Sequence, residues 1–283
     1  MFDLSIAIKN LISRSIQEDI SHGDITTDSL IPPEHHGEAV VIVKDKGTLA
    51  GITIAMEVFL QIDPAINYNI LVNDGGHVKE GDTVAELNGK TKSLLKGERL
   101  ALNFLQRASG IATETAEYVK TIEGTGARIV DTRKTTPGLR EIEKYAVKLG
   151  GGYSHRFNLS DGILIKDNHI SSLRPSMTIR DIISRAKANS PHTLTIEIEV
   201  ENYEEAKEAF DGNADIILLD NMTPEDMNRV VKLVNGKCLL EASGGIKLDT
   251  VRAVAESGVD LISVGSITHS VKSLDISLDF KLT

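Results

Sequence analysis

The chain has 283 residues, 41% of them hydrophobic and 25% charged, a composition typical of folded globular proteins and unlike that of disordered or fibrous chains. Its 31 Lys and Arg against 41 Asp and Glu give a net charge of −10, which argues against a generally basic surface for nucleic acid. The apolar runs, such as residues 39–43, have the length of a strand and are too short to span a membrane. We therefore expect neither nucleic acid nor a membrane as a partner.

The N-terminal segment has the pattern of an amphipathic helix. Apolar residues recur there at helical spacing: Leu4, Ile8, Leu11, Ile12 and Ile16. The segment contains Asp3 and has no basic stretch ahead of a continuous apolar block, so it is not typical of a secretory signal. The single cysteine, Cys238, excludes an internal disulfide, and we interpret it as a small buried hydrophobic residue. Together these features predict a cytoplasmic protein.

Residues 36–96 have a short, strand-like pattern interrupted by Asp-Gly and Asn-Gly turns, which predicts a small α+β unit. Within it, residues 74–87 resemble the turns of lipoyl-type carrier folds, but they lack an exposed lysine in the expected hairpin. A carrier or scaffold role is therefore a weaker alternative. Residues 97–124 follow with a continuous helical pattern and predict one long helix.

Beyond this helix, short apolar runs alternate with amphipathic segments. The expected strands are 127–132, 162–166, 193–200, 214–220, 238–243 and 260–265. The expected helices are 139–150, 178–189, 203–210, 224–234 and 248–257. Repeated β-α alternation requires parallel strands with crossover helices, and so predicts either an α/β barrel or a doubly wound sheet.

Polar side chains at the strand ends favour the barrel. Asp131, Lys166, Glu199, Asp220 and Glu241 lie at or near the C-terminal ends of successive expected strands. In a barrel these ends converge on one face and build one site. A doubly wound nucleotide-binding sheet usually carries a G-x-G-x-x-G turn after a strand, and this sequence has none there.

Basic residues are concentrated between residues 128 and 174. This stretch has nine Lys and Arg against five Asp and Glu, a net charge of +4, which leaves −14 for the rest of the chain. Arg140, Lys144 and Lys148 lie on an expected helix, and we assign them to a solvated face. The remaining candidates lie at strand ends or in the glycine-rich loop 150–162: Arg133, Lys134, His155, Arg156 and Lys166.

These five basic groups predict a ligand with several carboxylates or phosphates, because arginine binds such groups through paired hydrogen bonds. Lys134 and Lys166 also permit a different chemistry, since a desolvated lysine can form a Schiff base with a carbonyl substrate. A phosphate-binding barrel lyase is therefore an alternative. Two lysines among arginines fit neutralisation of an anion better.

The following strands supply acids and glycine turns. Glu199 and Asp220 end consecutive strands and suit Mg²⁺ held jointly with ligand phosphates, or hydrogen bonds to ribose hydroxyls. Two later turns combine serine and glycine between a strand and a helix: Ser243, Gly244 and Gly245, then Gly265 and Ser266. Such turns let backbone N–H groups approach a phosphate, which predicts a phosphoribosyl donor facing a carboxylate-bearing acceptor.

At these residues the sequence closely resembles the quinolinate phosphoribosyltransferase family. The resemblance extends nearly from end to end and is carried by these blocks: EDISHGDITTDSL, GTLAG, GERLALNFLQRASGIAT, DTRKTTPGLREIEKYAVKLGGGYSHRFNLSDGILIKDNHI, ILLDNM, EASGGI and VGSITHS. It implies an N-terminal open-faced α/β sandwich in residues 1–110 and an incomplete, seven-stranded α/β barrel in 111–268. It also implies a C-terminal segment, 269–283, that returns to the first domain.

The resemblance also implies site residues. It assigns six basic residues to the quinolinate carboxylates and the donor's pyrophosphate: Arg133, Lys134, His155, Arg156, Lys166 and, from a neighbouring subunit of a homodimer, Arg99. Glu199 and Asp220 would lie near the ribose and Mg²⁺, and would be catalytic together with Lys134 and Lys166. Ser243, Gly244, Gly245, Gly265 and Ser266 would hold the 5-phosphate. Glu98 and His269 also match motif positions of the family.

The activity that the resemblance implies is transfer of phosphoribose from phosphoribosyl pyrophosphate to quinolinate. The reaction proceeds with decarboxylation and gives nicotinate mononucleotide, pyrophosphate and CO₂ in NAD biosynthesis. Such an enzyme is a pentosyltransferase of the nicotinate-nucleotide diphosphorylase (carboxylating) type. A relative that uses nicotinate or another carboxylated acceptor is an alternative, although the number of basic groups favours a dicarboxylate.

Overall fold

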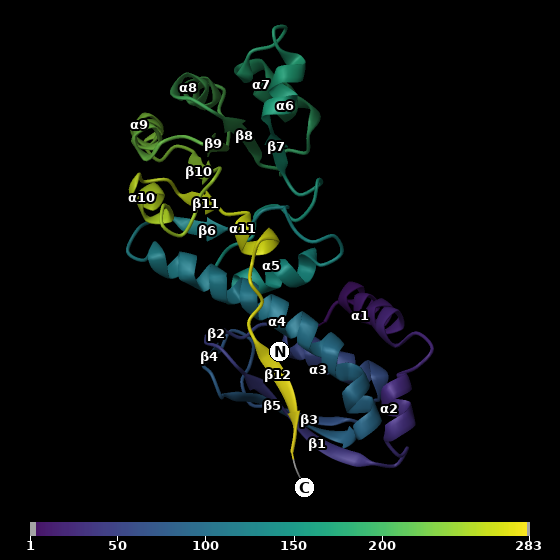
Figure 1. Ribbon diagram of the computed structural model, residues 1–283. Helices are drawn as coiled ribbons and strands as arrows, with labels where there is room; N and C mark the ends of the chain where they lie inside the picture. Colours follow the sequence, from purple (N-terminus) through teal and green to yellow (C-terminus); the bar gives the residue numbers. More distant parts are fainter. Residues whose placement is uncertain (1–3, 282–283) are drawn as a thin grey trace. The chain divides into compact units, whose positions relative to one another are not determined.

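The computed structural model describes residues 4–281, so Asp3 lies outside the described residues. The chain forms two compact units (Figure 1). The first unit contains the residues up to Ala116, Thr135–Gly151 and the residues from Ile267 on, and the second contains Glu117–Lys134 and Gly152–Ser266. These units differ in detail from the expected domain boundaries, which stay a prediction.

The first unit is built on an antiparallel sheet of four strands in the order β12-β1-β5-β3. These strands are β1 (His36–Val43), β3 (Asn67–Ile70), β5 (Thr83–Lys90) and β12 (Ile276–Phe280), and a separate two-stranded sheet pairs β2 (Gly47–Thr48) with β4 (His77–Val78). Along β1, Ala39, Val41 and Val43 are buried and alternate with more accessible residues. This alternation gives the sheet one core-facing side, as expected for an open-faced sandwich.

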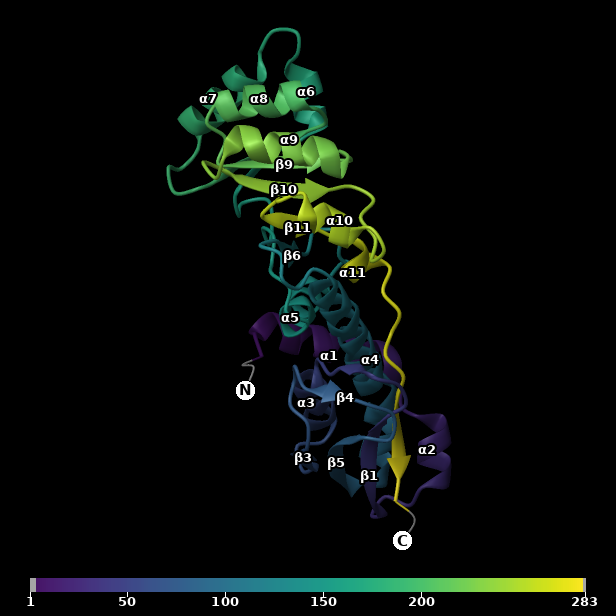
Figure 2. The same cartoon turned by 90° about the vertical axis from the view of Figure 1, so that its left-hand side faces the viewer.

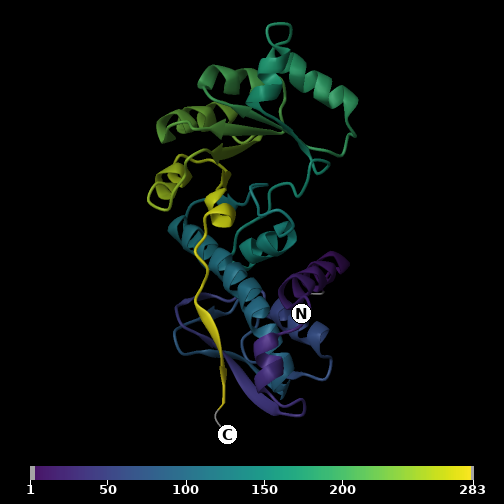
Figure 3. The ribbon, with the colours of Figure 1, turned by 45° about the vertical axis from the view of Figure 1, so that its right-hand side comes forward.

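Helices α1 (Ile6–Ile20), α2 (Ile25–Leu30) and α3 (Ile52–Ile62) belong to the first unit, together with most of α4 (Thr91–Thr121), α5 (Arg140–Leu149) and nearly all of α11 (Ser266–His269). Figure 3 shows α3 and α4 beside the strands of this unit. The N-terminal helix was predicted correctly, and Ile8 and Ile12 on it are buried. The long helix begins at Thr91, six residues before the expected start, because Thr91 and Leu94 continue its buried stripe.

The assignment of the α5 basic residues to a solvated face was wrong for Lys144, which is 3% exposed. Its neighbour Glu143 is also buried and accepts hydrogen bonds from Nε and Nη2 of Arg107 at 3.0 and 2.5 Å. Glu143 Oε2 also accepts the Thr136 backbone N–H at 3.1 Å. The side of α5 that carries Glu143 and Lys144 is therefore covered by other parts of the chain. The periodicity of a single helix does not show which of its charged residues are covered in this way.

The second unit contains six parallel strands in the order β6-β11-β10-β9-β8-β7. They are β6 (Arg128–Val130), β7 (Ile163–Ile165), β8 (Ile196–Val200), β9 (Ile216–Asp220), β10 (Leu239–Ser243) and β11 (Leu261–Ser263), so all six predicted strands are confirmed. Tyr153 extends this order through an isolated parallel bridge to Val130. No ladder among the described residues joins β7 to this end, so the barrel is incomplete.

Helices α7 (Ile179–Asn189), α8 (Tyr203–Asp211), α9 (Pro224–Val234) and α10 (Val251–Glu256) follow the pattern predicted from sequence, while α6 (Asp167–Leu173) was not predicted. In Figure 2 these helices lie along one side of the parallel strands. Strand residues such as Ile198 and Ile217 are fully buried, which supplies the apolar core of this unit. None of the helices within residues 4–281 is long and apolar enough to cross a bilayer.

Candidate active site

Strand alternation positions the polar side chains of the second unit. In β8, Ile196, Ile198 and Val200 are buried, and Glu197 and Glu199 alternate with them on the opposite face. The same period of two places Leu218 with Asp220 on β9, Glu241 with Ser243 on β10 and Leu164 with Lys166 at the end of β7. The face opposite the apolar core therefore carries acids, a lysine and a serine among its leucines, where most barrels carry aliphatic residues alone.

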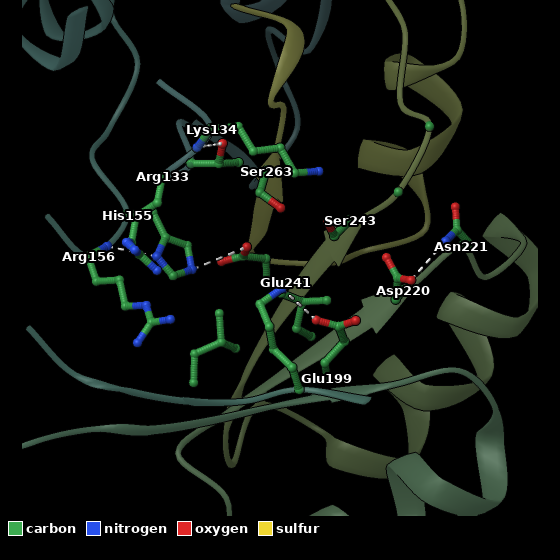
Figure 4. Close-up of a pocket in the computed structure, with 16 residues that line it drawn as sticks. Arg133, Lys134, His155, Arg156, Glu199, Asp220, Asn221, Glu241, Ser243 and Ser263 are labelled. Carbon is green, nitrogen blue, oxygen red and sulfur yellow. Dashed lines mark hydrogen bonds and ion pairs between the residues drawn. The ribbon is translucent and has the colours of Figure 1, made fainter. Parts of the chain in front are cut away.

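This face opens into a pocket of about 600 Å³ (Figure 4). Its lining residues are Thr132, Arg133, Lys134, His155, Arg156, Leu164, Lys166, Glu199, Leu218, Asp220, Asn221, Glu241, Ser243, Gly244, Gly245 and Ser263. Ten of the thirteen residues expected to bind substrate are among them. All sixteen belong to the second unit, and most lie at or just beyond the C-terminal ends of its strands.

The basic residues line one part of the pocket. Arg133, Lys134, His155 and Arg156 lie together in Figure 4, across from Asp220 and Ser243. Arg156 Nη1 donates to the Gly162 carbonyl at 3.4 Å, and its buried Nε has no hydrogen-bond acceptor among the described residues. Burial and the positive charge of Arg133 lower the pKa of Arg156, whereas Glu197 opposes this shift. Two neighbouring guanidinium groups that are partly withdrawn from water favour a ligand with negative charge.

Acidic residues line the other part of the pocket. Glu199 Oε2 accepts a hydrogen bond from Lys166 Nζ at 3.1 Å, and the side chains of Glu199 and Lys166 are 13% and 47% exposed. Asp220 Oδ2 accepts from Asn221 Nδ2 at 2.8 Å. The pocket is therefore bipolar, with cations beside β6 and β7 and carboxylates at β8 and β9.

A glycine turn follows β10 beside these acids. Gly244 has φ +92° and Gly245 has φ +61°, values that favour glycine. A Cβ added to Gly244 would collide with Asn221, whose backbone nitrogen would lie 2.8 Å away. Asn221 itself has φ +53°, and its N–H donates to the Ser243 carbonyl at 2.9 Å. This close approach makes glycine necessary at position 244.

A cluster of ionisable side chains joins buried acids of β8 and β10 to His155 of the loop before β7. The Nε2 atom of His155 is 3.1 Å from Glu197 Oε2 and 3.6 Å from Glu241 Oε1. Burial raises the pKa of Glu241 to about 7; the negative charge of Glu197 acts in the same direction and His155 opposes it. Asp131, also buried, accepts the His155 backbone N–H at 2.8 Å. The surroundings of the His155 ring are thus rich in carboxylates.

Three expected substrate-binding residues do not line this pocket. Arg99 is exposed on α4 in the first unit, and Gly265 and Ser266 follow β11 at intermediate exposure. Glu98 and His269 do not line it either. The roles of these residues stay predictions.

Sequence reasoning missed several pocket residues and the buried Glu197. Asn221, Thr132 and Ser263 are neutral side chains that stand next to predicted strand ends. Glu197 could have been found from the sequence, because the alternation Ile-Glu-Ile-Glu-Val places it on the same face as Glu199.

Two acids of the pocket are suited to hold a metal cation. Glu199 and Asp220 offer carboxylate oxygens, the ligands that Mg²⁺ prefers, at the ends of neighbouring strands. A separate group of possible metal ligands, His155, Glu197 and Glu241, has its ligand atoms within 4.8 Å of one another. Charged groups that could hold a cation are therefore present in this unit.

Comparisons with known proteins agree with this architecture. Residues 24–109 match the N-terminal domain of quinolinate phosphoribosyl transferase, and residues 111–279 match the C-terminal domain. A probable nicotinate-nucleotide pyrophosphorylase [carboxylating] of Bacillus subtilis is 43% identical over 278 residues, which cover 98% of this chain and 95% of the relative. The mitochondrial quinolinate phosphoribosyltransferase [decarboxylating] 2b of Nicotiana tabacum is 36% identical over 287 residues, covering 96% of this chain and 81% of the relative.

The fold is also that of a solved relative. The crystal structure of NadC from Streptococcus pyogenes superposes with a TM-score of 0.94 at 39% identity and covers all of both chains. The two matched domains together account for nearly the whole sequence. The chain therefore belongs to the quinolinate phosphoribosyl transferase family.

Proposed function

We propose that the protein transfers phosphoribose from phosphoribosyl pyrophosphate to quinolinate and releases pyrophosphate, CO₂ and nicotinate mononucleotide, as in de novo NAD biosynthesis. The observation that carries this proposal is the bipolar pocket, in a chain that matches both domains of the family. Quinolinate has two carboxylates, and Arg133 and Arg156 are suited to bind them through paired hydrogen bonds. Lys134 and Lys166 add further positive charge at the same pocket.

The donor would occupy the opposite part of the pocket. Ser243, Gly244 and Gly245 would hold the 5-phosphate, since their turn allows a close backbone approach. Glu199 and Asp220 would stabilise positive charge that develops on the ribose as the pyridine nitrogen attacks C1. Mg²⁺ bound at these two acids would neutralise the departing pyrophosphate. The basic residues hold the acceptor in place, so that positioning and electrostatics supply most of the catalysis.

Decarboxylation follows from the charge of the product. Once the nitrogen carries the ribose it is cationic, and it stabilises the electron pair left on C2 when the 2-carboxylate departs as CO₂; a proton from solvent then forms the C2–H bond of the product. Arg133 and Arg156 keep the ring in place during this step. We expect Arg133→Ala and Arg156→Ala each to nearly abolish turnover of quinolinate, and near-parental activity of both variants would contradict the assignment.

The decisive experiment is incubation of the protein with quinolinate, phosphoribosyl pyrophosphate and Mg²⁺, with detection of nicotinate mononucleotide and CO₂. Formation of both products supports the proposal, whereas turnover of nicotinate without CO₂ favours the alternative acceptor. Borohydride trapping of a substrate on Lys134 or Lys166 would favour the lyase. Failure to bind phosphoribosyl pyrophosphate would favour a carrier or scaffold. Omission of Mg²⁺ tests the cofactor.

A homodimer in the cytoplasm is part of the proposal. Arg99 is exposed and does not line the pocket of its own chain, so it is available to a partner subunit. Mixing Arg99→Ala with Glu199→Ala subunits tests this idea, because a hybrid dimer combines one intact pocket with one intact Arg99. Random mixing should restore about a quarter of the parental activity. No restoration would exclude a shared site.

A further inference from the structure

Glu197 has no role in the proposed chemistry, although it lies on the same face of β8 as Glu199. It is 5% exposed and is not among the residues that line the pocket. Its Oε1 atom is buried and has no hydrogen-bond partner among the described residues. Keeping a carboxylate in such a place costs free energy, so its contacts need a physical explanation.

The contacts of the two ring nitrogens of His155 show where the imidazole proton lies. His155 Nδ1 accepts the backbone N–H of Arg156 at 2.7 Å, which requires the lone pair of that nitrogen. The ring proton must then be on Nε2, the atom 3.1 Å from Glu197 Oε2. Glu241 Oε1, at 3.6 Å from Nε2, is too far away for a hydrogen bond.

The same contacts fix the backbone on which Arg156 stands. The N–H of His155 donates to the buried Asp131 at 2.8 Å, and the N–H of Arg156 donates to the ring. Both backbone donors are thus held, one by a carboxylate and one by an imidazole that a second carboxylate orients. The guanidinium group of Arg156 projects from this segment into the pocket, as Figure 4 shows.

We propose that Glu197 is a positioning residue for acceptor binding: it accepts the Nε2–H of His155, holds the ring in one tautomer and orientation, and so keeps Arg156 in place for the acceptor carboxylate. This inference rests on the proposed function, in which Arg156 binds that carboxylate. A carboxylate that accepts the second ring N–H of a metal-bound histidine fixes the tautomer of that histidine. Glu197 would act on His155 in the same way, with the backbone N–H of Arg156 in the place of the metal. Asp131 and Glu241 are the other acids that face His155.

Two variants separate the hydrogen bond from the charge. Glu197→Gln keeps an oxygen acceptor of nearly the same shape, whereas Glu197→Leu removes the acceptor. We expect Glu197→Leu to raise the KM for quinolinate about tenfold, with the KM for phosphoribosyl pyrophosphate changed less than twofold. Glu197→Gln should rescue most of this loss. A general structural defect would raise both KM values together.

The tautomer is measured directly by NMR on protein with ¹⁵N-labelled histidine, with His155→Gln used to identify the His155 signal. His169 is the internal reference, since its Nδ1 accepts the Lys166 backbone N–H at 2.9 Å and its signal should stay unchanged. In the parent and in Glu197→Gln, the proton should be on Nε2 of His155. In Glu197→Leu, the shifts should move toward those of a mixture of tautomers.

A proton on Nδ1 of His155 in the parent would overturn the inference, and so would an Nε2 atom without a proton, as in a metal complex. Parental quinolinate KM in a folded Glu197→Leu protein would overturn it as well. Because the NMR measurement needs no substrate, it tests the contact even if quinolinate is not turned over. A protein that does not turn over quinolinate would overturn the proposed function, but the tautomer assignment would still hold. If Glu197→Leu does not fold, the parent spectrum decides.

Discussion

Replacement of Gly244 by alanine should disrupt the donor side of the pocket. Gly244 has φ +92°, and the added Cβ would collide with Asn221, with the Cγ atom of Asn221 2.5 Å away. An L-residue with this backbone conformation costs about 1–2 kcal/mol, and overpacking costs typically 1–3 kcal/mol more. We therefore expect a loss of about 2–5 kcal/mol in the free energy of unfolding.

The collision should also change substrate binding, because Asn221 holds Asp220 through the 2.8 Å hydrogen bond to Oδ2. Relief of the clash displaces Asn221 and with it the carboxylate proposed to face the ribose. We expect the KM for phosphoribosyl pyrophosphate to rise about tenfold or more, equivalent to about 1.4 kcal/mol. Urea unfolding and steady-state kinetics measure the two effects separately.

Gly236→Ala is the matched control. Gly236 has φ +74° and no atom within 4 Å of an added Cβ, so it reports the backbone cost without a collision. It should lose about 1–2 kcal/mol and keep the parental KM values. Equal losses of stability in the two variants, with unchanged donor binding in Gly244→Ala, would refute the reasoning.

Three further predictions concern charged groups. Glu199→Gln should lower kcat more than it weakens quinolinate binding, measured by calorimetry, and an unchanged kcat would argue against a role at the ribose. Glu241 has its pKa raised to about 7, so the folded state binds its proton more tightly than the unfolded state, and stability should fall by about 1 kcal/mol per pH unit between about pH 4.5 and 7. Glu241→Gln should flatten that part of the profile, and identical profiles would contradict the shift. Arg107→Met should lower the free energy of unfolding by about 3–5 kcal/mol, because it leaves the buried Glu143 carboxylate without its cation. The double variant with Glu143→Leu should recover part of this loss. A loss below about 1 kcal/mol in Arg107→Met would exclude this ion pair as a stabilising element.

Most of the pocket could be predicted from the sequence because parallel strands bring their C-terminal ends to one edge. Glu199, Asp220 and Lys166 stand at such ends, so their convergence follows from the β-α alternation alone. The alternation along β8 places Glu197 on the same face as Glu199, but it does not show which group this inner carboxylate contacts. Its significance depends on the approach of His155 from a loop 42 residues earlier, a long-range contact that strand periodicity does not contain.

Two errors in the predicted elements have physical causes. The helical pattern of α5 identified the helix but not what covers its basic side, so Lys144 was assigned to solvent although it is buried. The start of α4 was misplaced because Thr91–Leu94 directly follows strand β5, without a turn residue that would mark the boundary. The first error comes from packing between segments that are distant in sequence, and the second from a boundary without a local signal.

The pairing of the last strand with the first has a consequence for synthesis of the protein. Strand β1 bonds β12 from Ala39–Phe280 to Val43–Ile276, so one edge of the first sheet is completed only by residues near the C-terminus. During synthesis on the ribosome, that edge of β1 therefore stays unpaired until the whole second unit has been made. The second unit can close earlier, since its residues end at Ser266. A nascent chain stalled before residue 276 should therefore expose an aggregation-prone strand edge, and premature termination there is more damaging than the loss of one short strand suggests.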